Sequence, residues 1–245
     1  MRTATQKPGV TVVVPVYDEA RTLERVVAGA LGELERLALP HVLLILDDGS
    51  TDGSRALATR LAARCPERVR TLAFSRNRGK GALLDEAFRR IETELAVVID
   101  ADGEYDAADL RPVLAPLVEQ RADWVLGSRY GFGRPRPVQY RATWAVNRAV
   151  NAWFALLSGM RLNDLLTGLY AFRTEVVRDL RLVERRFAYT PELIWKVLRR
   201  GRARLVEVPV SYRFRDYAAG KKIRWWETGT ILAATLRYKF RDGAA

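Results

Sequence analysis

The sequence is poor in sulfur and imidazole side chains, with one cysteine, Cys65, and one histidine, His41. This scarcity excludes a disulfide framework, a Cys/His zinc site and any machinery that needs two histidines. Long apolar runs are also absent. The longest uncharged stretch, Ala149–Met160, has 12 residues, whereas a membrane-spanning helix needs about 20. The first residues, MRTATQKPGV, lack the apolar stretch of a signal peptide. We therefore expect a protein of the reducing cytosol.

Positive charge is in excess, and it is unevenly distributed. The chain of 245 residues has 41 Lys and Arg against 29 Asp and Glu, a net charge of +12. Residues 1–133 have a net charge of −2, whereas residues 134–245 have a net charge of +14. We expect a single domain over 1–245, with a near-neutral half, 1–133, and a basic half, 134–245. The basic half is suited to nucleic acid, an anionic membrane surface or a phosphorylated ligand, unless it is only a solvated basic surface.

Short apolar segments alternate with segments of helical periodicity through the first half of the chain. Strands are expected at 10–14, 41–46, 69–74, 95–99 and 124–126, and helices at 21–37, 54–63, 82–91 and 107–120. This alternation predicts an α/β fold with a mostly parallel central sheet and helices on both faces. Beyond a loop at 131–137, we expect helices at 140–159, 191–200 and 226–240, strands at 169–172 and 205–212, and a basic loop at 214–224.

Polar clusters follow the predicted strands at the points where they end. Ligands of parallel sheets bind at the carboxyl ends of the strands. The clusters are Tyr17–Glu19, Asp47–Asp48, Asn77–Gly81, Asp100–Asp102 and Ser128–Tyr130. Their convergence on one edge predicts the position of the functional site.

Asp100 and Asp102 follow a buried apolar strand and are one residue apart. Two carboxylates in this arrangement can turn towards one cation, and oxygen ligands favour Mg²⁺ or Mn²⁺. Glu104 lies two residues further on and can supply another oxygen. The alternative is an ordinary turn with a helix cap at Asp106.

A series of motifs resembles one known family. These are VVVPVYDEARTL at 12–23, LDDGSTDGS at 46–54, NRGKGAL at 77–83, VVIDADGEYDAADL at 97–110 and LGSRY at 126–130. Asp164, Thr167–Gly168 and PELIWKVLRRG at 191–201 continue the series. Together they resemble the family 2 glycosyltransferases of GT-A fold, especially the polyprenyl-phosphate (dolichol-phosphate) mannose or glucose synthases. The resemblance covers roughly residues 9–226.

The resemblance implies a nucleotide-sugar donor, with transfer that inverts the anomeric carbon. By this likeness Pro15, Tyr17 and Glu19 border the nucleobase and ribose, and Asp48 binds one of them. Asp100, Ala101 and Asp102 form the DXD element. Asp100, Asp102 and Glu104 hold the metal ion, and Arg129 faces the phosphates or the sugar. A divalent ion and a guanidinium suit this reaction because the leaving diphosphate gains negative charge.

Lys80 lies in the glycine-flanked loop Asn77–Gly81. The glycines let the backbone approach a nucleotide closely, and Lys80 then lies near the phosphates. The alternative is a turn with a surface lysine. The P-loop pattern is absent from the sequence.

On the acceptor side the resemblance implies Asp164, Thr167 and Gly168, with Glu192 on the following helix. A hydroxyl acceptor needs a base, for which Asp164 is the first candidate and Glu192 the second. An ionised phosphate acceptor needs none, so the base stays open. A late basic segment of the family is matched by Arg215 and Lys222, which we expect to bind phosphate.

The expected activity is a metal-dependent transfer of mannose or glucose from GDP-mannose or UDP-glucose to a polyprenyl phosphate. The expected location is peripheral, at the cytosolic face of the membrane, where the helix at 140–159 and Trp225–Trp226 suit anionic headgroups. The first alternative is the same donor chemistry on a soluble acceptor. A basic nucleic-acid-binding protein is disfavoured because acidic strand ends repel a phosphate backbone. A non-catalytic scaffold is disfavoured by the intact Asp100 and Asp102.

Overall fold

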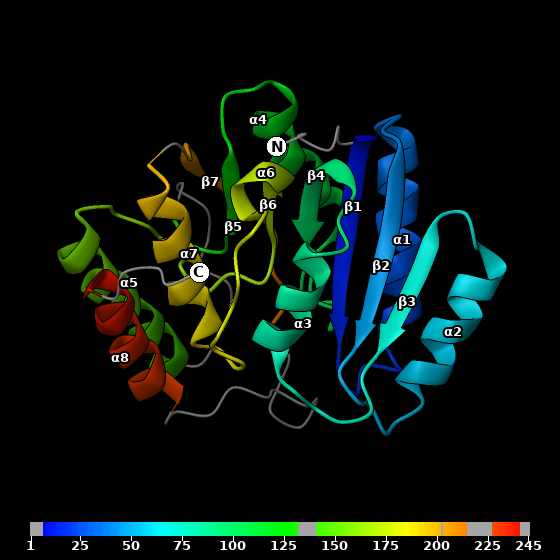
Figure 1. Cartoon of the computed structure of the whole chain (residues 1–245), viewed down its shortest axis with the longest axis horizontal. Coiled ribbons are helices and arrows are strands. Elements are labelled where there is room, and N and C mark those ends of the chain that lie inside the picture. The colour runs from blue at the N-terminus through cyan, green and yellow to red at the C-terminus, as the bar shows by residue number, and fades with distance from the viewer. Residues whose placement is uncertain (1–6, 132–140, 202, 215–226, 241–245) are drawn as a thin grey trace.

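The computed structural model describes residues 7–131, 141–201, 203–214 and 227–240. Their strands form one sheet of seven strands in the order β3-β2-β1-β4-β6-β5-β7 (Figure 1). The strands are β1 (Lys7–Val16), β2 (His41–Asp47), β3 (Val69–Ala73), β4 (Thr93–Val98), β5 (Trp124–Ser128), β6 (Tyr170–Arg173) and β7 (Leu205–Pro209). Pairs β1–β2, β1–β4, β2–β3 and β5–β7 are parallel. β6 is antiparallel to both of its neighbours, β4 and β5. The expected mostly parallel α/β sheet is confirmed.

The sheet has a hydrophobic core on each face, because β1 alternates its valines between the two. Val10, Val12 and Val14 belong to one cluster and Val13 to the other. The first cluster is closed by α1 (Leu23–Arg36), α2 (Ser54–Arg64) and α4 (Leu110–Val118). The second is closed by α3 (Lys80–Phe88), α5 (Arg141–Ser158), α6 (Thr174–Val177), α7 (Tyr189–Arg199) and α8 (Glu227–Phe240). Burial on both faces explains why these strands read as continuous apolar runs.

Two elements differ clearly from expectation, the helix at 107–120 and the strand at 205–212. The predicted helix at 107–120 is divided into a short 3₁₀ helix, η1 (Ala107–Asp109), and α4. The Asp106 carboxylate caps η1 by accepting the Ala108 N–H at 3.0 Å, so the cap and the acidic motif coexist. The predicted strand at 205–212 ends at Pro209. Beyond it, Tyr212 forms an isolated bridge with Tyr105, because the chain turns there towards the loop after β4.

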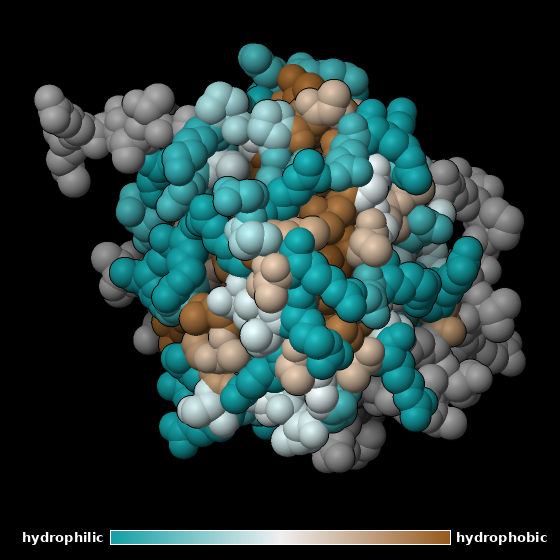
Figure 2. All heavy atoms as spheres, turned by 90° about the vertical axis from the view of Figure 1, so that its right-hand side faces the viewer, coloured by the Kyte–Doolittle hydropathy of each residue, from teal (hydrophilic) through white to brown (hydrophobic). Residues whose placement is uncertain are grey.

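Helices α5, α7 and α8 lie together at one end of the sheet (Figure 1). The Trp153 indole N–H of α5 donates to the Leu232 carbonyl of α8 at 3.2 Å, and α8 also packs on α7. None of the helices formed by the described residues is long and apolar enough to cross a membrane. The opposite end of the molecule, around β3 and α2, presents a mainly hydrophilic face (Figure 2).

Candidate active site

The carboxyl ends of β1, β2 and β4 bring three of the expected clusters to one edge of the sheet. Pro15 is buried at the end of β1, Tyr17 is half-buried just beyond it, and Glu19 is buried. The Glu19 N–H donates to the Ser54 hydroxyl at 2.8 Å. The Thr22 hydroxyl donates to the carbonyl of Ala101 at 2.7 Å. These bonds fix the loop after β1 against the loops after β2 and β4.

Asp48 holds the loop at Asn77–Gly81 in place. Its two carboxylate oxygens accept the N–H groups of Arg78 and Gly79 at 2.7 and 2.8 Å. Burial raises the pKa of Asp48 above its ordinary value, although these hydrogen bonds act in the opposite direction. In this structure, therefore, Asp48 positions the loop that carries Lys80. Direct contact with a base or ribose stays a prediction.

The glycines of this loop are required by another segment of the chain. A Cβ at Gly79 would lie 2.2 Å from the Arg185 carbonyl oxygen, and one at Gly81 would lie 1.9 Å from that of Glu184. The Gly81 N–H donates to the Arg185 carbonyl at 2.8 Å. The sequence interpretation assigned the close approach to a nucleotide. The structure shows a close approach to 184–186, which cross the loop, and approach of a nucleotide stays a prediction.

Lys80 and Asp100 form an ion pair at the edge of the sheet. Their side chains are 19% and 27% exposed, so both retain access to solvent. Burial alone would lower the pKa of Lys80, but the negative charge of Asp100 outweighs it and the pKa is raised. Gly168 packs against the same carboxylate, because a Cβ there would lie 2.1 Å from Asp100 Oδ2. Lys80, Asp100 and Gly168 thus form one compact cluster.

The expected metal set of three carboxylates is not assembled. Asp102 Oδ1 accepts the Glu104 N–H at 3.0 Å, while the Glu104 carboxylate accepts the Tyr212 hydroxyl. In the four described stretches, no three acidic, histidine or cysteine side chains are grouped so as to hold a metal ion. Asp100 and Asp102 still fit Mg²⁺ or Mn²⁺ in type, since two carboxylates with substrate phosphates suffice for such an ion.

Arg129 and Asp164 form the most buried ion pair of the site. Arg129 Nε and one terminal nitrogen donate to the two Asp164 oxygens at 2.7 Å each, and the Arg129 backbone N–H adds a bond of 2.9 Å. The side chains are 9% and 0% exposed. Burial alone would lower the pKa of Arg129, but the attraction of Asp164 raises it above its ordinary value. Both oxygens of the first base candidate are therefore engaged.

Three residues that sequence reasoning did not single out support this pair and the adjoining loop. The Glu207 carboxylate accepts the N–H groups of Asn163 and Asp164 at 2.9 Å. Tyr105 accepts the Gly168 N–H on its hydroxyl at 2.7 Å. Tyr212 binds Glu104, and the Arg129 guanidinium lies 5.0 Å from its ring centre. The only sequence signal for Tyr105 was its place directly after the acidic motif.

Glu192, the second base candidate, has a structural role. Its carboxylate is fully buried and accepts the N–H groups of Val183 and Glu184 at 2.8 Å. Lys196 donates to it at 2.7 Å. These bonds hold the segment that covers the Asn77–Gly81 loop. Thr167 is likewise engaged, since its hydroxyl donates to the Gly127 carbonyl. Arg215 and Lys222 lie outside the described residues.

The sheet order and this edge define a GT-A glycosyltransferase fold, and solved structures of that fold are similar. Glucosyl-3-phosphoglycerate synthase from Mycobacterium tuberculosis, solved with uridine diphosphate, matches with a TM-score of 0.73 and 19% identity over 97% of this chain and 82% of that one. Mannosyl-3-phosphoglycerate synthase from Rubrobacter xylanophilus matches with a TM-score of 0.72 and 19% identity, covering 95% of this chain and 73% of that one. At this identity the likeness concerns the fold alone.

The family model "Glycosyl transferase family 2" matches residues 11–178. The chain belongs to this family and is a glycosyltransferase. It is 32% identical to the polyprenol monophosphomannose synthase of Mycolicibacterium smegmatis, over 86% of this chain and 79% of that protein. It is 27% identical to the undecaprenyl-phosphate mannosyltransferase of Micrococcus luteus, over 86% of each. It is 32% identical to the glycosyltransferase AglJ of Haloferax volcanii, over 83% of this chain but only 62% of that protein.

Proposed function

We propose that this glycosyltransferase moves a hexose, mannose before glucose, from a nucleoside-diphosphate sugar to a polyprenyl phosphate. The observation that carries the donor half is the ion pair of Lys80 and Asp100 at the edge of the sheet, with the second carboxylate, Asp102, two positions further along the chain. Proteins that act on polyprenyl or undecaprenyl phosphate are among its relatives. The donor in this proposal is GDP-mannose or UDP-glucose.

The donor diphosphate lies beside Lys80 in this proposal, with Asp100 and Asp102 facing it across an Mg²⁺ or Mn²⁺ ion. Such an ion, when bound, stabilises the negative charge that the departing nucleoside diphosphate gains. A solved structural neighbour contains Mn²⁺ and uridine diphosphate. Arg129, held rigidly by Asp164, presents its remaining surface to the phosphates or the transferred sugar. A fixed cation of this kind lowers the barrier because it does not reorganise during the reaction.

The absence of a free base among the residues considered for that role favours a phosphate acceptor. Asp164 is fully committed to Arg129, and Glu192 to three hydrogen bonds. A phosphomonoester has a second pKa of about 6, so it is already a nucleophile at neutral pH. Attack by its oxygen opposite the diphosphate gives the inverted sugar phosphate without a proton transfer from the acceptor.

The acceptor lipid implies contact with the cytosolic membrane face, which α5 and α8 are suited to make. Leu156 on α5 is 74% exposed, and Phe240 on α8 is 71% exposed. Arg148 on α5 is also exposed. Apolar and basic side chains together are typical of a peripheral membrane surface. The alternative acceptor is soluble, since structural neighbours are solved with phosphoglyceric acid.

The test is transfer from radiolabelled GDP-mannose or UDP-glucose with Mg²⁺ or Mn²⁺ present. We expect an organic-soluble product with a polyprenyl phosphate and none with 3-phosphoglycerate. The reverse result would favour the soluble acceptor. Asp102→Asn should abolish transfer, whereas Glu67→Gln removes an exposed carboxylate and should leave it unchanged. Full activity of Asp102→Asn would contradict the assigned site.

A further inference from the structure

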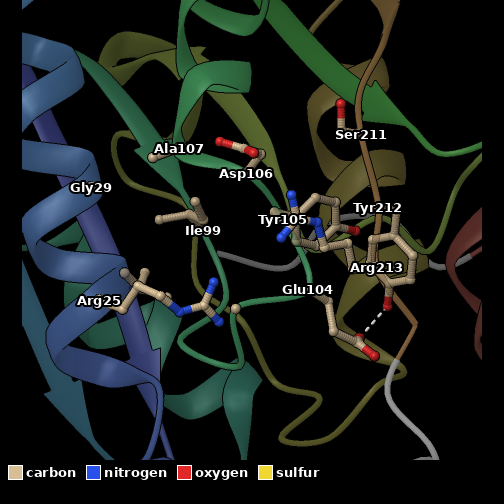
Figure 3. A pocket seen from close by; sticks show the side chains of 12 residues that line it. Arg25, Gly29, Ile99, Glu104, Tyr105, Asp106, Ala107, Ser211, Tyr212 and Arg213 are labelled. Atoms are coloured by element: carbon tan, nitrogen blue, oxygen red, sulfur yellow. Dashed lines mark hydrogen bonds between the residues drawn. The ribbon is translucent and has the colours of Figure 1, made fainter.

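A surface cavity of about 240 Å³ lies beside the acidic loop, between α1, residues 103–107 and residues 211–213 (Figure 3). Its lining includes Arg25 of α1 and Arg213, but not Asp100, Asp102 or Lys80. Ligand sites for larger molecules usually measure about 300–1,000 Å³, and one water needs roughly 10–15 Å³. The space therefore suits a ligand of a few carbon atoms.

Two guanidinium groups extend into this cavity from opposite walls (Figure 3). In the stretches that the structure describes, neither Arg25 nor Arg213 has a carboxylate partner. Arg25 also lies against the acidic loop, because a Cβ at Gly103 would be 2.3 Å from its terminal nitrogen. Arg213 is tied to the other side of the same loop, since its backbone N–H donates to the Glu104 carbonyl at 2.8 Å.

Among the described residues, the acidic side chains of the lining form no ion pair with Arg25 or Arg213. The Glu104 carboxylate is turned away and binds the Tyr212 hydroxyl (Figure 3). One oxygen of Asp106 caps the N–H of Ala108. Its second oxygen has no hydrogen-bond partner within the described residues, and neither has the hydroxyl of Ser211. The lining thus combines two exposed arginines, without a carboxylate partner among the described residues, with two exposed groups able to bind hydroxyls.

We propose that this cavity is a binding site for a small hydroxylated phosphate monoester, separate from the donor site. Guanidinium groups bind phosphate oxygens in pairs, with directional, charge-assisted hydrogen bonds. A phosphate between Arg25 and Arg213 neutralises both charges, and its hydroxylated carbons lie towards Asp106 and Ser211. The bound molecule links α1 to residues 211–213 across the loop that carries Asp102. It therefore contacts the chain on both sides of that loop, and the inference does not rest on the identity of the proposed donor or acceptor.

Calorimetry at constant ionic strength tests this site with glycerol 3-phosphate, inorganic phosphate and uncharged glycerol as probes. We expect glycerol 3-phosphate to bind most tightly, inorganic phosphate more weakly and glycerol not at all. Arg25→Gln and Arg213→Gln should each weaken the affinity for glycerol 3-phosphate by about tenfold or more. Arg60→Gln is the matched control, because it removes an exposed arginine from α2, at the hydrophilic end of the molecule (Figure 2).

The interpretation of each result is direct. A site distinct from the donor site is supported if only the Arg25 and Arg213 variants lose binding of glycerol 3-phosphate. These variants should still bind uridine or guanosine diphosphate. Equal binding of glycerol 3-phosphate by the wild type and the Arg25→Gln/Arg213→Gln double variant would overturn the proposal. So would absence of binding to the wild type, or a loss in Arg60→Gln as large as in the other two variants.

Discussion

Removing the negative charge of Asp164 tests whether the buried pair with Arg129 organises the site. Asp164→Asn keeps the size of the side chain but leaves the Arg129 guanidinium, 9% exposed, without its counter-charge. It also replaces one of the two oxygens that accept from Arg129 with an amide donor. Breaking a buried pair by neutralising one partner costs about 3–5 kcal/mol. For a chain of this size we expect a fall in Tm of about 6–20 °C.

The matched comparison is an ion pair on the surface. Arg68 and Glu35 are 51% and 55% exposed, and pairs of this kind contribute about 0–1 kcal/mol. Glu35→Gln should therefore change Tm by no more than a few degrees. Urea unfolding of both variants, followed by fluorescence, measures the difference as a shift in midpoint at unchanged slope. Donor binding should also be measured at low temperature, because a destabilised variant is still folded under that condition.

One result would refute the reasoning. If Asp164→Asn and Glu35→Gln lose the same small amount of stability, Arg129 does not depend on Asp164 for its charge balance. A double variant, Arg129→Met/Asp164→Leu, separates the pair from the packing around it. Since paired removal of a buried ion pair is often nearly neutral for stability, we expect the double variant to be more stable than Asp164→Asn, yet inactive because Arg129 is gone.

Two further predictions concern other parts of the structure. Gly168→Ala places a Cβ 2.1 Å from Asp100 Oδ2, which should displace Asp100 from Lys80 and lower kcat by about 100-fold. The control is Gly32→Ala in α1, whose Cβ meets nothing within 4 Å and which should leave kcat unchanged. Equal activity of the two variants would contradict the assigned cluster. Hydrogen bonds from Arg204 lower the pKa of Asp123 below 3.8, so this carboxylate stabilises the fold above pH 3.8 and loses that effect as the pH falls through its lower folded-state pKa. Asp123→Asn should therefore reduce stability by up to about 1 kcal/mol at neutral pH, a value limited by the solvent exposure of Arg204. Thermal unfolding of both proteins at a series of pH values should show the gap closing in acid, and a gap that is independent of pH would contradict this origin.

The sheet could be predicted from the sequence because each strand has a local signal. The run at Val10–Val14 is buried on both faces, and the polar residues begin where that strand ends. The antiparallel direction of β6 was not predictable in the same way. Apolar alternation in a strand of four residues, Tyr170–Arg173, carries no information about direction. That direction depends on how 131–169 return to the sheet, which no local pattern records.

The meeting of polar clusters at one edge of the sheet could be predicted, but the pairings between their side chains could not. Lys80 and Asp100 both lie in motifs, yet nothing in the sequence indicates that they pair with each other. The glycines of the Lys80 loop make room for Glu184 and Arg185, a contact that no sequence pattern indicates, and their role towards a nucleotide stays a prediction. Glu104 bonds to Tyr212, 108 positions away. Contacts of this kind depend on loop conformations, which neither periodicity nor residue spacing determines.

The basic half of the chain does not supply the cations that are assigned to the donor. Lys80 and Arg129, the two cations assigned to the donor, both come from the near-neutral half. The basic half contributes Asp164 and Glu207 there, an acid that pairs with Arg129 and an acid that holds the backbone of Asp164. The excess of positive charge in 134–245 is therefore not concentrated on these residues. With its net charge of +14, this half suits anions that approach from outside, such as a lipid phosphate or a headgroup surface.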